Sequence, residues 1–500
     1  MTSDDSYWMM IWKDFYKRPL GKIAFFAVLA FCLVGIYAPF LAASKPLIVQ
    51  YDGKWYFPLF RYLYYQGYYT KGLDIFFNLL IFIAPLILIS LYLSRGHRKL
   101  MISLFVFLVS LQMGTFLYFL NFPIQDPAFN APFSLKEQQD ITSHPLPNWD
   151  RELRYLSNYT KLNLVLSYQQ KLNQQNRLQK YIAAYQANEP HHSSPTLWQM
   201  QQDSQQSELQ RLQSILNSSP KNSEPYLHAN AWIHYIHDRQ NWLESQQQLI
   251  KYKVMPFIRP FHWEDDAGGN QRLNHFVPFW ELTRINSKDL VAALIFGIRI
   301  SLVVGILSVS LALIIGIPIG AFAGFYGGTF DIIVSRLLEI WEAMPTFFML
   351  LMVVAILQSK SIFLVITIIG LFGWTTFSRY IRGEFFKQRN LPYTEACRAI
   401  GLPNHHIMFS HIMPNAIPPV LTLLPFAIMG AITSEAGLSF LGLGEENSCS
   451  WGVLMDEGRS VFPGEPYLLW PPAILLTLLL VAIALVGDSF RDALDPKMRK

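Results

Sequence analysis

The sequence predicts an all-α integral membrane protein with about eight transmembrane helices and an inserted polar helical domain. Of its 500 residues, 52% are hydrophobic and only 15% are charged, whereas soluble domains carry about 25% charged residues. So few charges could not cover the surface of a soluble protein of this length. Mean hydropathy is nevertheless only +0.23, so long polar stretches must accompany the apolar ones.

A helix that crosses the hydrocarbon core of a bilayer needs about 20 mostly apolar residues. Eight stretches of the sequence meet this requirement. The first has a long apolar run and no clear cleavage site, so we interpret it as an uncleaved span rather than a signal peptide. The predicted spans are approximately 21–43, 73–94, 100–120, 292–323, 333–357, 361–380, 416–440 and 467–488.

The short loops predict the orientation, because lysine and arginine are retained on the cytoplasmic side of a membrane. With eight spans, the four basic clusters of the chain fall on one face, and the net charge of +5 reflects this arrangement rather than nucleic-acid binding. We therefore expect both termini in the cytoplasm and the polar region 121–287 outside. The clusters are Lys13, Lys17, Arg18 and Lys22; Arg95, Arg98 and Lys99; Arg379, Arg382, Lys387, Arg389 and Arg398; and Arg491, Lys497, Arg499 and Lys500.

The polar region 121–287 is rich in glutamine and electrically neutral, with 15 basic and 15 acidic residues. Its apolar residues recur every three or four positions, which is typical of helices. We expect a small helical domain outside the membrane; the alternative is a disordered glutamine-rich loop. The predicted helices include Leu153 to Leu166, begin at Ser194-Pro195 and end at Leu216, and run from about Glu224 to Lys251.

Catalytic signatures are absent from the sequence, which has no phosphate-binding GxxxxGK[ST] loop, no HExxH and no GxSxG motif. His234 and His237 share a helix face, so a metal site is conceivable, but without a third well-spaced ligand solvated histidines are favoured. The three cysteines form no CxxC pair. We therefore predict a non-catalytic chain without a metal site.

The strongest functional signal is the predicted cytoplasmic loop after the sixth span. It contains a short helix of good helix formers that is closed by Gly401. A basic amphipathic stretch continues to Pro414, where the next span begins. Small side chains at Ala396 and Ala399 permit close approach of another protein, and Gly401 permits a sharp turn. Such a helix is suited to a groove in a cytoplasmic partner; the alternative is an ordinary basic loop.

This loop resembles the coupling motif of permease subunits in binding-protein-dependent ABC importers, which is Glu-Ala-Ala-x3-Gly with a proline thirteen residues after the glycine. The motif here is Glu395-Ala396-Cys397 with Gly401 and Pro414, so cysteine replaces the second alanine. The resemblance to the C-type permease subunits of bacterial dipeptide and oligopeptide importers covers about 288–496. Its further motifs are Gly297-Ile-Arg299-Ile-Ser301, Gly324-Phe-Tyr326-Gly327-Gly328-x2-Asp331, Ala343-Met-Pro345-Thr, Arg379-x2-Arg382-Gly-Glu384, Glu435-Ala-Gly-Leu-Ser439-Phe-Leu441-Gly442-Leu-Gly444, Ser450-Trp451-Gly452 and Gly487-Asp488-x2-Arg491-Asp492.

The resemblance implies a type I ABC importer permease fold, with a MetI-like core made of the first span and the five spans after residue 288. It also implies four protein partners: two ATPase subunits of the D/F type, a B-type permease subunit, and an extracytoplasmic peptide-binding protein. ATP and magnesium would bind to the ATPase subunits, so no cofactor is expected in this chain. The implied location is the bacterial inner membrane. The residues implied to dock on an ATPase subunit are Glu395, Ala396, Cys397, Ala399, Gly401 and Pro414.

The chain also departs from the family pattern. The usual Gly-Thr-Asp-x3-Arg-Asp segment before the core reads Leu282-Thr-Arg284-Ile-Asn286-Ser-Lys288-Asp289 here, and Asp289 alone clearly persists. Trp55-Tyr56-Phe57-Pro58 resembles the Yej-type branch. We predict five segments: a cytoplasmic N-terminus with the first span (1–45), an extracytoplasmic segment (46–72), an inserted pair of spans (73–120), the extracytoplasmic helical domain (121–287), and the permease core (288–496) with its coupling loop (393–414).

Charged residues at membrane depth suggest function, because burying an unpaired charge costs several kcal/mol. Arg299 and Glu435 could line the substrate path near an outer gate, together with Ser439. The alternative is a structural role for Arg299 and Glu435, in which they join one helix to another. Glu339 and Glu342 are better explained by an interfacial structural role.

Together these features predict the permease subunit of an ATP-driven, binding-protein-dependent importer of di- or oligopeptides that works by alternating access. A secondary transporter or channel without an ATPase is one alternative, although neither internal repeats nor many buried charges support it. The other is a membrane anchor for a protein-binding extracytoplasmic domain.

Overall fold

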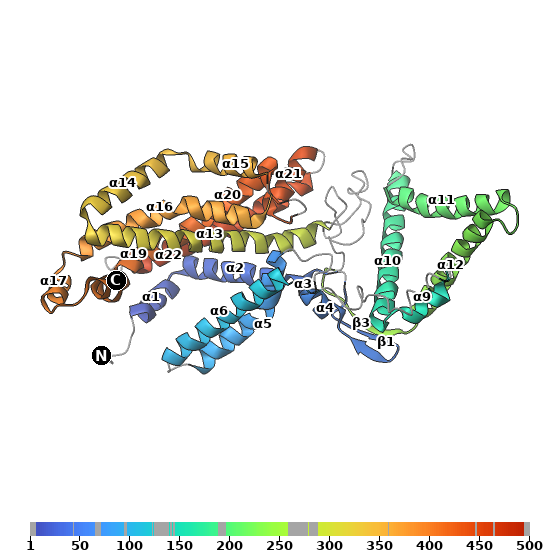
Figure 1. The fold of residues 1–500 in the computed structure, drawn as a ribbon, viewed down its shortest axis with the longest axis horizontal. Coiled ribbons are helices and arrows are strands. Elements are labelled where there is room, and N and C mark those ends of the chain that lie inside the picture. Colours follow the sequence, from blue (N-terminus) through green and yellow to red (C-terminus); the bar gives the residue numbers. More distant parts are fainter. Residues whose placement is uncertain are drawn as a thin grey trace. The chain divides into compact units, whose positions relative to one another are not determined.

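The computed structural model divides the chain into two compact units, one formed by Met1–Gly35 with Leu294–Lys500 and the other by Ile36–Ala293. Figure 1 shows the elements of both units. The structure describes residues 7–494 except 44, 66–71, 95–97, 123, 125–139, 141–142, 144–145, 189–196, 259–278, 280–288, 359, 446–447 and 464–465.

Helices make up the described part of the first unit (Figure 1). Several are long and apolar, and shorter ones lie between them. Their bounds are α1 (Tyr7–Tyr16), α2 (Pro19–Ile36), α13 (Leu290–Tyr326), α14 (Gly328–Ala343), α15 (Thr346–Leu357), α16 (Ile362–Gln388), α17 (Pro392–Ala399), α18 (Asn404–His406), the π-helix η3 (Ile407–Ile412), α19 (Met413–Leu421), α20 (Leu424–Leu438), the π-helix η4 (Ser439–Leu443), α21 (Trp451–Val461), the 3-10 helix η5 (Pro466–Leu468) and α22 (Trp470–Leu494).

Among the described residues, seven helices are long and apolar enough to cross a membrane, or eight spans if one bent pair counts as a further span. This confirms the predicted helical membrane architecture. The predicted span 333–357 is not one straight helix, because α14 and α15 meet at an angle of 76°. Pro345 lacks an N–H and keeps Met344 in extended backbone (φ −85°, ψ 126°), which ends α14. The predicted span 416–440 likewise divides into α19 and α20.

Helices α13 and α16 pack backbone against backbone. Gly316, Gly320 and Gly324 recur every four residues on one face of α13. A Cβ atom at these positions would lie 2.5, 2.2 and 2.6 Å from a carbonyl oxygen of α16. Small residues at this spacing allow membrane helices to approach closely, so α13 and α16 form one tightly joined pair. The facing carbonyl groups belong, in the same order, to Trp374, Ser378 and Arg382.

An apolar cluster of the first unit lies where the ends of α13 and α16 meet η3 and α19. Its buried members come from segments far apart in the sequence, and they surround the base of the short helix α17. These members include Phe325, Phe377, Ile381, Phe385, Ile407, Met408, Ile412, Ala416 and Val420.

The second unit contains a helical hairpin, a small sheet and a group of polar helices (Figure 1). The hairpin consists of α5 (Gly72–Leu93) and α6 (Arg98–Asn121), which pack extensively on each other. Both helices qualify as membrane spans, as predicted for 73–94 and 100–120. Two short helices, α3 (Ala38–Leu41) and α4 (Pro58–Tyr64), precede the hairpin.

A three-stranded antiparallel sheet of order β2-β1-β3 accompanies these helices. Its strands are β1 (Ile48–Tyr51), β2 (Lys54–Tyr56) and β3 (Ile250–Val254). Asp52-Gly53 connects β1 and β2 with positive φ at both residues (49° and 73°), and Asp-Gly is a strong hairpin signal. Our sequence analysis overlooked this signal. It also extended the third polar helix to Lys251, which lies in β3 because pairing with β1 ends the helix.

The polar helices are α9 (Trp149–Tyr155), α10 (Asn158–Asn188), α11 (Leu197–Ser218) and α12 (Glu224–Gln247). The predicted periodicity from Leu153 to Leu166 therefore falls on two helices. Asn148 begins α9 by accepting a hydrogen bond from the backbone N–H of Arg151 at 3.0 Å. The predicted helix start at Ser194-Pro195 lies outside the described residues. Leu162, Val165 and Leu243 join β1 in a buried apolar cluster.

Candidate functional site

The short helix α17 (Pro392–Ala399) contains most of the predicted coupling residues. Pro392 occupies its first position, where a missing N–H is tolerated. Thr394 is fully buried, and its hydroxyl donates to the backbone carbonyl of Gln388 at 2.9 Å. This bond fastens the start of α17 to the end of α16. The sequence analysis did not single out Thr394, because a threonine within a short helix has no distinctive pattern.

Gly401 ends α17 through a pair of backbone hydrogen bonds. Its N–H donates to Arg398 at 3.0 Å, and the N–H of Leu402 donates to Cys397 at 3.1 Å. This pattern is a Schellman motif, whose glycine adopts a left-handed conformation; φ of Gly401 is +78°. The structure thus explains the glycine of the motif as the residue that stops α17 and turns the chain.

The two faces of α17 differ in character. Tyr393, Cys397 and Leu402 pack against the apolar cluster below the helix. Glu395, Ala396 and Ala399 are exposed on the other side. The replacement of alanine by Cys397 is therefore accommodated on the packed face, while the exposed face keeps its small side chains.

The exposed face continues into an apolar side chain beyond the helix end. Ile400 is 74% exposed, and Gly401 and Pro414 are also exposed. The side chain of Glu395 forms no hydrogen bond or ion pair within the part of the chain that the structure describes. We define Glu395, Ala396, Ala399, Ile400 and Gly401 as the coupling face. Pro414 lies in the first turn of α19, separated from α17 by η3. It is therefore not part of α17.

Ion pairs and caps connect the helices next to α17. Arg382 of α16 forms a two-bond ion pair with Asp331 of α14, one bond measuring 2.9 Å. Arg379 pairs with Glu342 in the same two helices. Arg389 donates to the carbonyl groups of Gly324 and Phe325 at 3.2 and 3.4 Å, at the end of α13. These contacts explain the charged residues of the Gly-Gly-x2-Asp and Arg-x2-Arg motifs as connections between helices.

Glu435 is the centre of a buried polar cluster at another place in the first unit. It is 1% exposed, and its Oε1 accepts hydrogen bonds from Ser439 at 2.7 Å and from Ser450 at 2.6 Å. The Ser450 hydroxyl also accepts a bond from the N–H of Gly452 at 3.2 Å and so begins α21. The structure therefore brings Glu435 and Ser439 together, and adds Ser450, which the sequence analysis noted only within a family motif.

Arg299 has a different environment from Glu435. It is 1% exposed, and its Nε donates to the carbonyl oxygen of Gly35 at 2.7 Å. Gly35 lies at the end of α2, where helix carbonyl groups lack intrahelical donors. Arg299 thus joins α13 to the first span. Trp451 supports the same helix, because its Nε1 donates to the carbonyl of Leu294 at 3.0 Å.

Comparisons with known proteins identify the class of protein that this geometry defines. The model of the family described as "Binding-protein-dependent transport system inner membrane component" matches residues 316–500. The matched segment contains α17, the coupling face and the Glu435 cluster. This match confirms the MetI-like membrane core that we inferred from the sequence.

Relatives of similar sequence indicate which branch of this family the chain resembles. "Oligopeptide transport system permease protein OppC" of Haemophilus influenzae is 35% identical over 258 residues, 50% of this chain and 81% of that protein. "Dipeptide transport system permease protein DppC" of Alkalihalophilus pseudofirmus is 32% identical over 280 residues, 52% of this chain and 90% of that protein. These similarities show that the chain belongs to the family of inner membrane components of binding-protein-dependent transport systems. They confirm its resemblance to C-type permeases.

A third relative is "Peptidoglycan transport system permease protein YejE" of Agrobacterium fabrum, which is 36% identical over 219 residues. The match covers 44% of this chain and 57% of that protein, so the chain spans just over half of this relative's length. A solved structure of the inward-facing MetNI methionine ABC transporter matches 41% of this chain and 96% of its own, at 17% identity and a TM-score of 0.34. A likeness at that level supports no argument about mechanism.

Proposed function

We propose that this chain is the permease subunit of an ATP-driven importer of di- or oligopeptides, and that the coupling face binds a cytoplasmic ATPase subunit. The observation that carries the proposal is the two-sided construction of α17. One side is fastened to the membrane helices by Thr394 and the apolar cluster, while the other presents small side chains and the exposed Ile400. A helix built in this way suits a groove of a partner protein.

The contacts around α17 supply a route for mechanical coupling. Displacement of α17 by an ATPase subunit would move the end of α16 through Thr394. The glycine contacts would transmit this movement from α16 to α13, because close-packed backbones cannot slide independently. The membrane helices would then alternate between outward-open and inward-open arrangements.

The partners follow from the same proposal. This sequence has no phosphate-binding loop, so two ATPase subunits of the D/F type would bind ATP and magnesium. A B-type permease subunit would complete the translocation path, and an extracytoplasmic binding protein would deliver substrate. The names of the OppC and DppC relatives refer to oligopeptide and dipeptide transport, which supports a peptide substrate. In this proposal the chain itself catalyses no reaction.

We also propose the predicted topology, with both termini in the cytoplasm of a bacterium and the chain in the inner membrane. The basic loops support it, as does the count of eight spans that results when the bent pair α14–α15 is taken as one span. The hairpin α5–α6 then returns the chain to the outer side, where α9–α12 form the inserted extracytoplasmic domain. The core function would reside in the segment after residue 288.

The buried polar residues of the core have structural partners that bear on the proposed substrate path. Arg299 holds the end of α2, and Glu435 joins α20 to α21. We propose that these residues, with Ser439, set the position of path-lining helices near the outer gate. A secondary transporter is not favoured, because the chain's relatives are ABC permeases.

Changing the charge of the coupling face tests the proposal. Glu395→Lys and Ile400→Asp should each reduce copurification of the ATPase subunits, and peptide uptake by cells, by roughly tenfold or more, because interface hot spots contribute at least 2 kcal/mol. Both side chains are exposed, so the chain should fold and reach the membrane normally. Glu224→Lys, an exposed charge reversal in α12, is the matched control. Unchanged ATPase association and uptake in both coupling-face variants would refute the proposal.

A further inference from the structure

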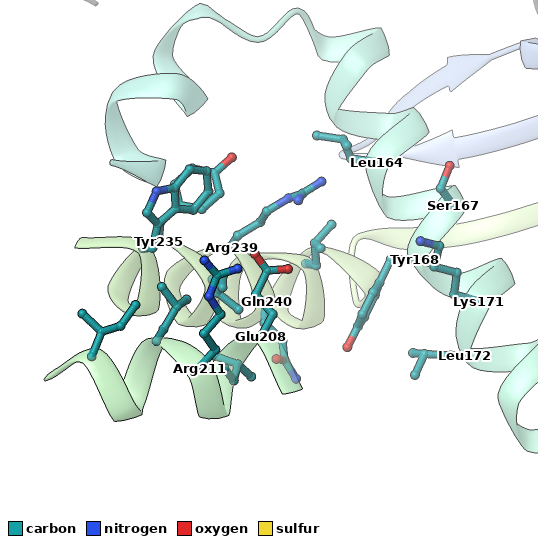
Figure 2. Close-up of a pocket in the computed structure, with 16 residues that line it drawn as sticks. Leu164, Ser167, Tyr168, Lys171, Leu172, Glu208, Arg211, Tyr235, Arg239 and Gln240 are labelled. Atoms are coloured by element: carbon teal, nitrogen blue, oxygen red, sulfur yellow. The ribbon is translucent and has the colours of Figure 1, made fainter. Parts of the chain in front are cut away.

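A pocket in the second unit lies between three of the polar helices, well away in sequence from the permease core. It has a volume of about 680 Å³ and is lined by residues of α10, α11 and α12 (Figure 2). Small-molecule sites in proteins measure about 300–1,000 Å³, so this pocket has the size of a ligand site. Neither the coupling face nor the Glu435 cluster accounts for it.

Aliphatic side chains from all three helices form part of the pocket wall. Leu164 and Leu172 come from α10, Leu212 and Ile215 from α11, and Leu243 from α12. Such walls favour a ligand with an apolar body, because each buried CH₂ group contributes about 0.8 kcal/mol. The apolar lining is thus one half of the recognition chemistry.

Basic side chains supply the other half. Lys171 of α10, Arg211 of α11 and Arg239 of α12 line the pocket from three helices, and Glu208 is its one acidic lining residue (Figure 2). Three positive charges against one negative charge favour an anionic group on the ligand. Because these positive charges come from three different helices, they can surround a single anionic group of a ligand.

The side chains of the two arginines have no carboxylate partner among the described residues. Neither the Arg211 nor the Arg239 side chain forms a hydrogen bond or ion pair there, and the Nε of Arg239 is buried without an acceptor. A buried guanidinium N–H without a partner is costly. The guanidinium carbon of Arg239 lies 5.7 Å from the centroid of the Trp149 ring.

Two carboxylates near the pocket accept hydrogen bonds from its phenols. Tyr168 donates to Glu244 at 3.2 Å, and Tyr235 donates to Glu152 at 2.5 Å. Both phenols are pocket-lining residues whose hydroxyl groups are already used. These two carboxylates are therefore already engaged, and Glu208 is the acidic side chain that lines the pocket beside the three basic ones.

We propose that this pocket binds an amphipathic carboxylate, with its apolar part against the leucines and its carboxylate at Arg211 and Arg239. Two sources share this chemistry: a short apolar peptide with a free C-terminus, and a medium-chain fatty acid. The peptide is the occupant that extends the proposed transport function, and this extension rests on that function. The pocket would then hold a peptide within the polar helical domain.

Calorimetric titration of the full chain in lipid nanodiscs tests the pocket, with empty nanodiscs as the blank. The probes are trileucine, trileucine amide and octanoate. Trileucine should bind the unaltered chain, and its amide should bind roughly ten- to hundredfold more weakly, the effect of losing a charged hydrogen bond. Arg211→Gln and Arg239→Gln should weaken trileucine binding to a similar degree. Tight binding of octanoate without trileucine binding would assign the pocket to fatty acids.

Arg154→Gln in α9 is the matched control, because Arg154 is exposed and does not line the pocket. Arg211 is also exposed, so its variant should fold even if Arg239→Gln does not. The inference is refuted if neither carboxylate binds at millimolar concentration, if the amide binds as tightly as the acid, or if Arg211→Gln binds like the unaltered chain. Copurification of ATPase subunits with the same variants separates this result from the proposed function, which predicts no change there.

Discussion

Gly320 and Ser378 bring two membrane helices into backbone contact: a Cβ atom on Gly320 would lie 2.2 Å from the carbonyl oxygen of Ser378. No side chain other than hydrogen fits between α13 and α16 at this point. The same relationship recurs one turn away on each side, at Gly316 and Gly324. These glycines of α13 therefore set how close α16 lies to α13, and with it the position of α17, which follows α16 in the chain.

Enlarging this contact should separate the two helices. Gly320→Leu is expected to destabilise the chain by about 1–3 kcal/mol or more, the usual cost of overpacking. The measurement is thermal denaturation of the purified chain in detergent, in which the loss of monodisperse protein is monitored as the temperature rises. Gly383→Ala in α16 is the control, because a Cβ there meets nothing within 4 Å. Equal stability of the two variants would contradict the packing argument.

The ion pair between Asp331 and Arg382 should stabilise the junction of α14 and α16. Its side chains are 15% and 26% exposed, so solvent screens the pair only in part. Asp331→Asn or Arg382→Gln should each cost about 1.5–3 kcal/mol, the contribution of hydrogen bonds to charged groups. A double-mutant cycle by thermal denaturation measures the coupling. The double variant should be nearly as stable as either single one; full additivity would show that the pair contributes nothing.

The Glu435 cluster should tolerate an amide better than an alkyl side chain. In Glu435→Gln the side-chain oxygen can still accept from Ser439 and Ser450, whereas Glu435→Leu leaves two buried hydroxyl groups without an acceptor. The leucine variant should lose about 1–3 kcal/mol for each unsatisfied group, and the glutamine variant much less. Thermal denaturation and peptide uptake provide the measurements. If glutamine proved as damaging as leucine, the carboxylate charge would itself be required.

The inserted domain should lose stability at high pH through Tyr235. Burial, together with the hydrogen bond to Glu152, raises the pKa of this phenol from 10.0 to about 12. As the pH rises, the phenol ionises at a lower pH in the unfolded chain than in the folded chain. Between pH 10 and about pH 12 the folded chain therefore binds more protons than the unfolded chain, and its free energy of unfolding falls as the pH rises through this interval. Burial raises the pKa of Tyr51 to about 12 as well, with the same sign.

Thermal unfolding of the full chain between pH 9 and pH 12 measures this dependence. Tyr235→Phe should be less stable at neutral pH, because it loses a hydrogen bond, but its stability should fall less steeply with pH. Glu152→Gln should show an intermediate slope, since burial of the phenol remains. A slope unaffected by Tyr235→Phe would show that this residue does not link folding to proton binding.

Local features of the site were predictable because short-range chemistry encodes them. Gly401 ends α17, as its position after a short run of helix formers indicated. Glu395, Ala396 and Ala399 are exposed together because they share one face of a short helix. The hairpin turn at Asp52-Gly53 had an equally local signal, although our sequence analysis did not use it.

Other functional contacts could not be read from the order of residues. Arg299 and Gly35, or Glu435 and Ser450, meet only because separate segments pack together. Pro414 has the family spacing from Gly401, yet η3 places it on a different helix from the coupling face. The pocket arginines Arg211 and Arg239 come from different helices, so their convergence had no signal in either sequence segment.

The sequence by itself determined that this chain is a helical membrane protein with a short helix closed by Gly401. Hydrophobic length, charge position and the spacing of a short motif all act over neighbouring residues or a single helix. Only the tertiary structure decided which charges are joined, which glycines carry the contact between α13 and α16, and where the inserted helices enclose a pocket. Those properties depend on the distance between residues far apart in the chain, and packing in three dimensions alone sets that distance.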